Sequence, residues 1–333
     1  MVMKKFINDA TNIVQELLEG YALAFPEKIR LEGDYLITRA KPKEYGKVGL
    51  VSLGGSGHEP SHIGYVGFGL LDVCVPGDIF IAPGPHRCLD ALKRADRGAG
   101  ILLIVGNHPA DLLTSKLTLE MANKEGLNVK MVLNHEDIAS GSRSRSEERR
   151  GLVGFLPLYK VAGAAAEEGR SFEEVTTIAK VFSHEMCTLA VAVSPATHPL
   201  TGSTFFEIGE DEMDIGMGSH GEAGMERLKM MTADDTAQLM LERLLEDLDV
   251  KSGQDLLVIL SGAGATTLME LFIVFRKMHQ ILTEKKIRIA RSLIDEVITT
   301  QEQAGFQMFI ARVNKELLGL WDAPCDSPYF TVR

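Results

Sequence analysis

Residues 47–60 read Lys47-Val48-Gly49-Leu50-Val51-Ser52-Leu53-Gly54-Gly55-Ser56-Gly57-His58-Glu59-Pro60, an apolar run that ends in closely spaced glycines. Such a run predicts a buried strand over 47–52 followed by a turn. Two similar apolar runs follow at 99–105 and 129–133, and segments 88–95 and 115–125 between them have helical character. Apolar strands that alternate with helices predict a mainly parallel α/β sheet.

The rest of the chain extends this pattern into a second half. Near residue 185 the register changes, and the alternation of strands and helices then begins again. We therefore expect two α/β domains, 1–185 and 186–333, with mainly parallel or mixed sheets flanked by helices. The further predicted helices are 9–24, 157–168, 172–185, 233–248 and 267–283, and the further strands are 189–193 and 256–260. Residues 140–150 are polar and predict a solvated surface loop, with anion binding by its arginines as the less favoured alternative.

The composition excludes several classes of protein. Of 333 residues 45% are hydrophobic, which excludes disorder as the main state, and no run of 18 apolar residues predicts a membrane span. With 46 acidic and 35 basic residues the net charge is −11, which disfavours direct binding to nucleic acid. Residues 1–9 lack the apolar core of a signal peptide. The four scattered cysteines predict reduced thiols in the cytoplasm.

Ligands of open α/β sheets bind beyond the carboxyl ends of strands, and four segments qualify: 54–60, 106–111, 216–222 and 261–267. In the first, glycines allow close backbone approach to a ligand, and Ser56 and His58 add polar groups. The segment lacks the lysine of a phosphate-binding loop and the GxGxxG spacing, so a nucleotide is not expected. A tight turn with an incidental histidine is an equally weighted alternative. For 261–267, a plain strand-to-helix turn is favoured over an anion site.

His220 lies among Gly216, Gly218, Gly221 and Gly224, which predicts an unshielded imidazole. A neutral imidazole can add to a reactive carbonyl, although a satisfied loop histidine is an equal alternative. Asp111 lies near a predicted helix start, where capping is its commoner use.

His108 is expected at the surface. A metal site is disfavoured because His58, His62, His86 and His108 do not form a compact ligand set, and no cofactor is expected.

Taken together, the motifs resemble those of the dihydroxyacetone-binding subunit of dihydroxyacetone kinases, over nearly the whole chain. The resemblance rests on their order and number rather than on any single motif. The segments that carry it are Gly54 to Pro60, Gly64-Tyr65-Val66-Gly67, Arg149-Arg150-Gly151, Gly163-Ala164-Ala165-Ala166-Glu167, Gly216 to Glu222, Gly264-Ala265-Thr266 and Leu320-Trp321-Asp322-Ala323-Pro324.

The resemblance implies a mechanism and partners. It makes His220 the residue that binds the ketone carbon covalently as a hemiaminal, with His58 and Asp111 holding or activating the hydroxyls. Gly55, Ser56 and Gly57 would add backbone contacts. Covalent capture would select dihydroxyacetone over glycerol, which has no carbonyl. The resemblance also implies a homodimer and a nucleotide supplied by a separate ADP-binding subunit.

The chain departs from this family where phosphoryl transfer needs positive charge. The family usually has KNYTGD where this chain has Gly106-Asn107-His108-Pro109-Ala110-Asp111, so glycine replaces the lysine. Loss of that cation with retention of His220 is typical of a sensor. The family includes coactivators of TetR-like transcription regulators, which act by protein contact, and the resemblance favours this role. The alternative is the substrate-binding subunit of a phosphotransferase-system-linked dihydroxyacetone kinase.

Overall fold

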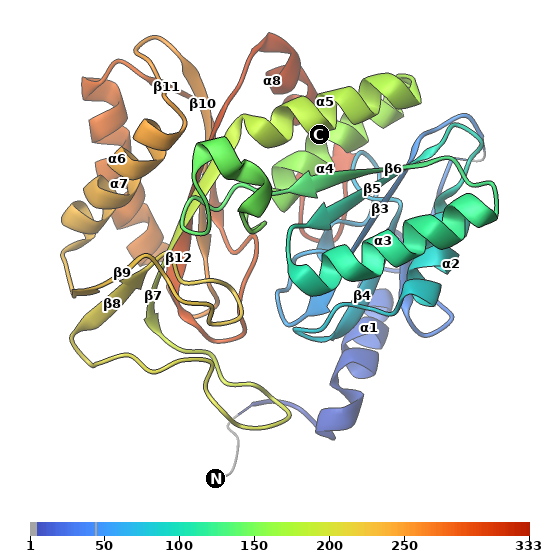
Figure 1. The fold of residues 1–333 in the computed structure, drawn as a ribbon, viewed down its shortest axis with the longest axis horizontal. Helices are drawn as coiled ribbons and strands as arrows, with labels where there is room; N and C mark the ends of the chain where they lie inside the picture. The colour runs from blue at the N-terminus through green and yellow to red at the C-terminus, as the bar shows by residue number, and fades with distance from the viewer. Residues whose placement is uncertain (1–4, 44) are drawn as a thin grey trace.

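The computed structural model describes residues 5–43 and 45–333, which form two six-stranded sheets flanked by helices (Figure 1). The predicted α/β class is therefore confirmed. The α-helices are α1 (Ile13–Ala24), α2 (Pro85–Ala95), α3 (Pro109–Lys124), α4 (Phe155–Glu167), α5 (Phe172–His184), α6 (Ala233–Asp247), α7 (Leu268–Glu284) and α8 (Lys315–Asp322). Short 3₁₀ helices are η1 (Ala10–Asn12), η2 (Ile63–Tyr65) and η3 (Arg143–Glu148).

The first sheet has the strand order β1-β2-β4-β3-β5-β6 and lies on the right in Figure 1. Strands β4, β3, β5 and β6 are parallel to one another, whereas β1 and β2 add an antiparallel edge. The bounds are β1 (Ile29–Glu32), β2 (Leu36–Arg39), β3 (Gly49–Ser56), β4 (Val73–Ile79), β5 (Ile101–Gly106) and β6 (Val129–Asn134). The parallel part carries two of the four predicted ligand segments, 54–60 and 106–111, at the carboxyl ends of β3 and β5.

The second sheet has the order β11-β10-β12-β7-β8-β9, and only the β10–β11 pair in it is parallel. Its strands are β7 (Met186–Ser194), β8 (Glu212–Ile215), β9 (Glu226–Lys229), β10 (Asp255–Gly262), β11 (Arg288–Asp295) and β12 (Ala304–Arg312), and a small sheet pairs β13 (Cys325–Asp326) with β14 (Thr331–Val332). The two large sheets fall on either side of residue 185, and the division into domains there stays a prediction.

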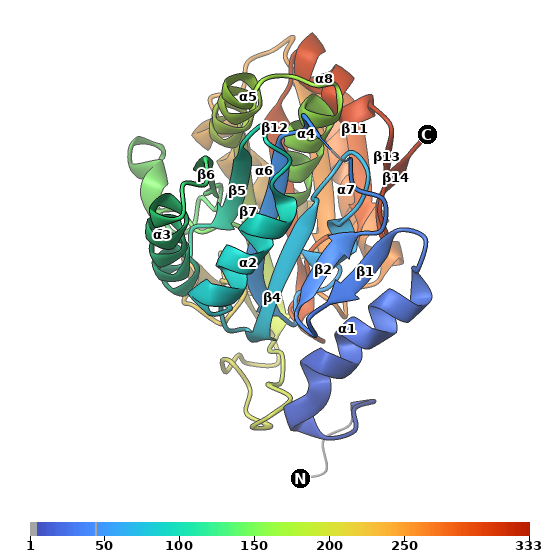
Figure 2. The ribbon, with the colours of Figure 1, turned by 90° about the vertical axis from the view of Figure 1, so that its right-hand side faces the viewer.

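Helix α4 is buried along nearly its whole length and joins the two sheets into one core. Its residues share an apolar cluster with Leu50 of β3 and Phe309 of β12. Seen from the side, α4 and α5 lie at the top of the molecule above the first sheet (Figure 2). The four cysteines are buried and none is paired in a disulfide. Among the described residues, no helix is long and apolar enough to span a membrane.

Two local predictions are wrong. Strand β3 continues through the glycines to Ser56, because Gly54 and Gly55 pair with Pro76 and Gly77 of β4. The segment 140–150 is not simply a solvated loop, since it contains η3 and ends in a buried arginine.

The side chain of Arg149 is only 1% exposed because its guanidinium pairs with Asp247 at the end of α6. Arg150 pairs with the buried carboxylate of Asp137. These pairs attach the segment to the protein interior instead of leaving its arginines in solvent.

Candidate functional site

A cavity of about 240 Å³ opens at the carboxyl ends of β3 and β5 and is closed by the loop that follows β8. Gly55 and His58 line it from the first segment, and Asp111 lines it from the first turn of α3. His220 reaches it from the second sheet. The structure therefore brings four of the six predicted site residues to one cavity, and their roles in ligand binding stay predictions.

The two predicted histidines face each other. Nε2 of His58 lies 3.0 Å from Nε2 of His220, and Nδ1 of His58 lies 2.8 Å from the carbonyl oxygen of Thr299. A carbonyl oxygen only accepts hydrogen bonds, so Nδ1 of His58 carries the hydrogen and its Nε2 is an acceptor. Burial, and then the charge of His220, lower the pKa of His58 well below its usual value. His58 is therefore a neutral ring whose Nε2 can accept a hydrogen bond from His220.

Glu222 holds the other side of His220. Its Oε2 accepts the backbone N–H of His220 at 2.9 Å, and its Oε1 lies 3.3 Å from the Nδ1 of that ring. Burial alone would raise the pKa of Glu222. The hydrogen bond with His220 and the charge of that ring instead lower the pKa of Glu222 well below its usual value. An ionised carboxylate beside Nδ1 favours a hydrogen there, as in histidine–carboxylate pairs that orient a reactive imidazole.

The prediction that His220 is unshielded is wrong. Its side chain is only 30% exposed, because the rings of His58, Phe80 and His108 pack around it with centroids 5.0–5.7 Å away. The glycines of the loop supply conformational freedom, including a positive φ at Gly216, but neighbours from the first sheet cover the ring. The imidazole is therefore held in place by aromatic contacts and two polar partners.

Asp111 is not the cap of α3, contrary to the commoner use of such a residue. The cap position belongs to His108, and Asp111 is the third helical residue. Burial raises the pKa of Asp111 to about 7, although His220 opposes this shift. The carboxyl group thus changes charge near neutral pH while facing the cavity.

His108 is buried, so the expectation that it lies at the surface is wrong. Its Nε2 donates to the carbonyl oxygen of Gly151 at 3.0 Å, which leaves Nδ1 without a hydrogen. Burial, followed by the charge of His220, lowers the pKa of His108 to about 4. This neutral ring presents a free lone pair toward the cavity.

Ser56 and Gly57 do not line the cavity. The Ser56 hydroxyl donates to the carbonyl oxygen of Gly77 at 2.7 Å, and the Gly57 N–H donates to the Glu59 carboxylate. Gly57 has a φ of +102°, and a side chain there would meet the Phe80 ring. Their local role in the structure is to shape the turn that presents His58.

Sequence reasoning gave no role in the site to His62 and Glu222. His62 lines the cavity beside Gly54, where an added Cβ would lie 2.5 Å from His62 Nε2. It follows His58 by four residues, and Glu222 follows His220 by two, so short spacing was the available signal. The partner of Glu222 is His220 itself, whereas His62 contacts Tyr159, 97 residues further along the chain, which leaves no local pattern.

The other predictions on ligand sites have different outcomes. The segment 261–267 is a plain strand-to-helix turn, as favoured, because Thr267 and Glu270 form a capping box at the start of α7. Of the histidines first considered for a metal, His58, His62 and His108 all line the cavity, but they are not a group whose ligand atoms lie within 4.8 Å of one another. Within the described residues, a different group places one possible ligand atom each within 4.8 Å of the others, and it consists of His108, His220 and Glu222.

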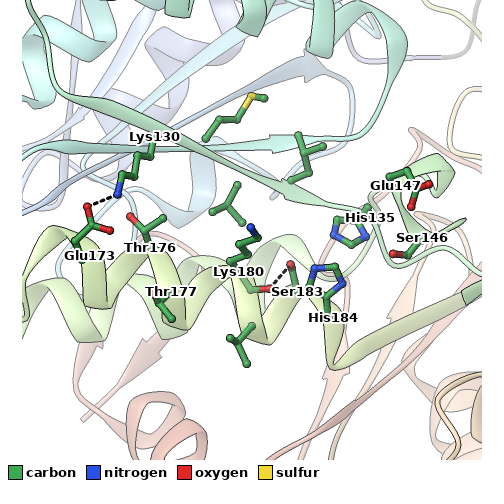
Figure 3. Close-up of a pocket in the computed structure, with 14 residues that line it drawn as sticks. Lys130, His135, Ser146, Glu147, Glu173, Thr176, Thr177, Lys180, Ser183 and His184 are labelled. Atoms are coloured by element: carbon green, nitrogen blue, oxygen red, sulfur yellow. Dashed lines mark hydrogen bonds and ion pairs between the residues drawn. The ribbon is translucent and has the colours of Figure 1, made fainter. Parts of the chain in front are cut away.

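A larger cavity, of about 760 Å³, lies between β6 and α5 and contains none of the predicted site residues. Figure 3 shows His135 and His184 facing each other at one end and Lys130 paired with Glu173 at the other. Although this cavity is larger, its polar side chains do not converge on one point at hydrogen-bond distance. We therefore place the candidate site at the smaller cavity with His58 and His220.

Fold and site together define an α/β protein with a histidine-lined cavity at the carboxyl ends of its parallel strands. The model of the Dak1 domain matches residues 19–329, so the chain belongs to the Dak1 domain family, as its motifs indicated.

Similar proteins include both kinase subunits and regulators. The dihydroxyacetone-binding subunit of a PTS-dependent dihydroxyacetone kinase from Listeria innocua is 36% identical to this chain. The match covers 94% of this chain and 95% of the Listeria protein. The corresponding subunit of the PEP-dependent kinase from Escherichia coli is 32% identical, with 98% of each covered. A solved structure titled dihydroxyacetone kinase operon co-activator Dha-DhaQ has 29% identity and a TM-score of 0.90, covering 96% of this chain and 98% of that one.

Proposed function

We propose that this protein binds dihydroxyacetone by forming a hemiaminal between its ketone carbon and Nε2 of His220. The observation that carries the proposal is the 3.0 Å approach of His58 Nε2 to His220 Nε2, with Glu222 on the other side of the His220 ring. This arrangement supports a nucleophilic imidazole with a proton acceptor and an orienting carboxylate. Dihydroxyacetone binding by the similar kinase subunits, as their names state, supports the choice of ligand.

The step balances with one proton shared between the two Nε2 atoms. His58 takes that proton, and the lone pair of His220 Nε2 then forms a bond to the carbonyl carbon. The π electrons of the C=O bond move to the oxygen, which takes the proton back from His58. The product is a hydroxyl-bearing hemiaminal on a positively charged His220 ring, and the carboxylate of Glu222 neutralises that charge. Asp111 lines the same cavity and would hold a ligand hydroxyl.

Capture is tested by intact-mass spectrometry and by ¹³C NMR with dihydroxyacetone labelled at the carbonyl carbon. We expect the wild-type protein to gain the mass of one ligand per chain and the carbonyl resonance to move to the range of a tetrahedral carbon. His220→Gln should abolish both signals. His279→Gln, on the exposed face of α7, is the matched control and should leave them unchanged. An adduct that survives in His220→Gln would refute the proposal.

For the biological role we favour a ligand-sensing coactivator over a kinase subunit. Among the described residues that line the cavity, none is a lysine or arginine, and Gly106 stands where the family usually has lysine. Phosphoryl transfer depends on positive charge around the transferred group, so this lining supports capture without transfer. The likeness to the operon co-activator structure agrees with this role.

The proposed partners are a second copy of this chain and a TetR-like transcription regulator, contacted as protein because the chain's net charge of −11 disfavours DNA. A regulator responds only if its affinity differs between the free and ligand-bound protein. The alternative partner is an ADP-binding kinase subunit, and the kinase names of the similar sequences described above support this alternative.

One assay separates the two roles. Purified protein is mixed with dihydroxyacetone, the ADP-loaded nucleotide-binding subunit of the matching kinase system, and phosphoenolpyruvate with the proteins that pass its phosphoryl group to that ADP. Formation of dihydroxyacetone phosphate is followed, with a working kinase subunit as the reference. We expect no turnover above background. Turnover comparable to the reference would establish the kinase role and reject the coactivator.

A further inference from the structure

We infer that His108, His220 and Glu222 form a binding site for a divalent transition-metal ion of the Zn²⁺ class, and that this ion and the ketone exclude each other. The site itself follows from geometry alone, whereas the exclusion rests on the proposed capture by His220. Nδ1 of His220 lies 3.3 Å from Oε1 of Glu222, and Nδ1 of His108 lies 4.0 Å from the same oxygen. The three ligand atoms all lie within 4.8 Å of one another.

These separations suit a tetrahedral ion after a small closure. Zinc binds imidazole nitrogen and carboxylate oxygen at about 2.0–2.2 Å, which places two tetrahedral ligands about 3.4 Å apart. The pair between His220 and Glu222 already has that spacing. Two imidazoles and one carboxylate leave a fourth position open for water, and imidazole ligands favour zinc over magnesium or calcium.

His108 carries the outer hydrogen bond that metal-binding histidines usually have. Its Nε2 donates to the carbonyl oxygen of Gly151 at 3.0 Å, so the lone pair on Nδ1 is fixed toward His220 and Glu222. The ring is nearly buried and cannot turn freely, with 11% of its side chain exposed.

Metal binding would disable the nucleophile. An ion on Nδ1 of His220 replaces the hydrogen that faces Glu222 and leaves the remaining ring hydrogen on Nε2, where His58 accepts it. In the capture step His58 takes this hydrogen and leaves a neutral imidazole, but with an ion on Nδ1 the same removal would leave an imidazolate. His58 therefore does not take the hydrogen, and Nε2 has no lone pair for a carbonyl carbon. Conversely, a hemiaminal keeps its hydrogen on Nδ1 and closes that ligand position. The same ring thus serves either the ion or the ketone.

The metal site is tested by adding metal-free protein to a chromophoric chelator that has been preloaded with Zn²⁺. No ketone is present. We expect one Zn²⁺ per chain to move from the chelator to the wild-type protein. His108→Gln should weaken this affinity roughly tenfold or more, as loss of a fixed ligand would. His86→Gln, an exposed histidine on α2, is the matched control and should bind as the wild type does. No transfer from the chelator, or equal affinity in His108→Gln, would overturn the site.

Exclusion is tested by repeating the ¹³C-ketone experiment with Zn²⁺ and then with excess chelator. We expect Zn²⁺ to reduce the adduct at least tenfold and chelator to restore it, and His108→Gln to form the adduct in the presence of the same Zn²⁺ concentration. An adduct of undiminished yield on zinc-loaded wild-type protein would overturn the exclusion. Absence of the adduct from metal-free protein would instead refute the proposed capture, and the chelator titration alone would decide the metal site.

Discussion

His62 and Tyr159 are joined by a buried 2.6 Å hydrogen bond whose direction is fixed by the groups beyond it. The Ser52 hydroxyl donates to the carbonyl oxygen of Ile104 at 2.8 Å, so it accepts from Tyr159, and Tyr159 in turn accepts from Nδ1 of His62. The remaining ring nitrogen, Nε2, therefore carries the lone pair, and it lies beside Gly54 in the wall of the cavity. His62 is thus a fixed hydrogen-bond acceptor in the candidate site.

Tyr159→Phe should destabilise the protein, because the buried Nδ1 hydrogen of His62 and the oxygen of Ser52 both lose their partner. We expect a loss of about 1–3 kcal/mol in the free energy of unfolding, measured by chemical denaturation. Tyr45→Phe removes a hydroxyl from a side chain that is 87% exposed and should change stability by less than about 0.5 kcal/mol. Equal effects of the two substitutions would contradict the proposed chain of hydrogen bonds.

Asp111 should make the protein less stable as the pH rises toward neutrality. Its pKa is raised to about 7 by burial, whereas an unfolded aspartate has a pKa of about 3.9. Between these values the folded state holds a proton that the unfolded state has released. The contribution of Asp111 to the free energy of unfolding is therefore largest below pH 4. It falls by up to about 1.4 kcal/mol per pH unit as the pH rises and is lost above pH 7.

The comparison with Asp111→Asn isolates this contribution. The pKa of Glu136 is also raised to about 7 by burial, but it is common to both proteins and cancels in the difference. We expect the stability of wild type relative to Asp111→Asn to fall between pH 4 and pH 7, as measured by denaturation at each pH. A difference that is flat, or that rises over this range, would show that the carboxyl is not protonated in the folded state.

The strands and helices were predictable because their signals are local. The apolar run before Gly54 predicts β3, and the glycine-framed His220 marks a loop with chemistry. What could not be predicted depends on distant partners. The tautomer of His58 is set by Thr299, 241 residues away, and the burial of His108 depends on Gly151. No spacing within a segment encodes such contacts.

The segment 140–150 illustrates the same limit through charge. A run of serines and arginines is typical of solvated loops, and Arg145 does lie there, with 64% of its side chain exposed. Arg149, four residues later, is buried because Asp247 lies at the end of a helix 98 residues further on. The sequence shows the arginine, but it does not show that Asp247 compensates the charge of the buried guanidinium.

Asp247→Asn should therefore cost far more than a change to a surface pair. It leaves the guanidinium of Arg149 buried without its countercharge and also weakens the contact with Arg143 at 2.7 Å. We expect a loss of about 3–5 kcal/mol in the free energy of unfolding. Glu148→Gln, which removes an exposed partner of Arg145, is the control and should cost no more than about 1 kcal/mol. Comparable losses in the two variants would argue against a buried ion pair.

We expect Gly106 and Phe155 to be energetically coupled, because the Phe155 ring occupies the space that a side chain at residue 106 would need. Residue 106 is the position at which the resemblance places a lysine. A Cβ at Gly106 would lie 2.7 Å from Cζ of Phe155, and that ring is packed edge-on against His62 with centroids 4.5 Å apart. Gly106→Ala should destabilise the protein by about 1–3 kcal/mol through overpacking. In Phe155→Leu the ring edge is gone, so the same alanine should cost less there.

The double-mutant cycle of Gly106→Ala and Phe155→Leu measures this coupling directly. We expect the double variant to be more stable than the sum of the single losses by about 0.5–3 kcal/mol in chemical denaturation. Strict additivity would mean that Phe155 moves aside freely and that glycine is not required at 106 by its neighbour. If the coupling holds, Gly106→Lys alone cannot restore the family's cation beside the ligand, because Phe155 occupies the space that the first side-chain carbon needs. Under the proposed coactivator role, a gain of phosphoryl transfer would then require both positions to change.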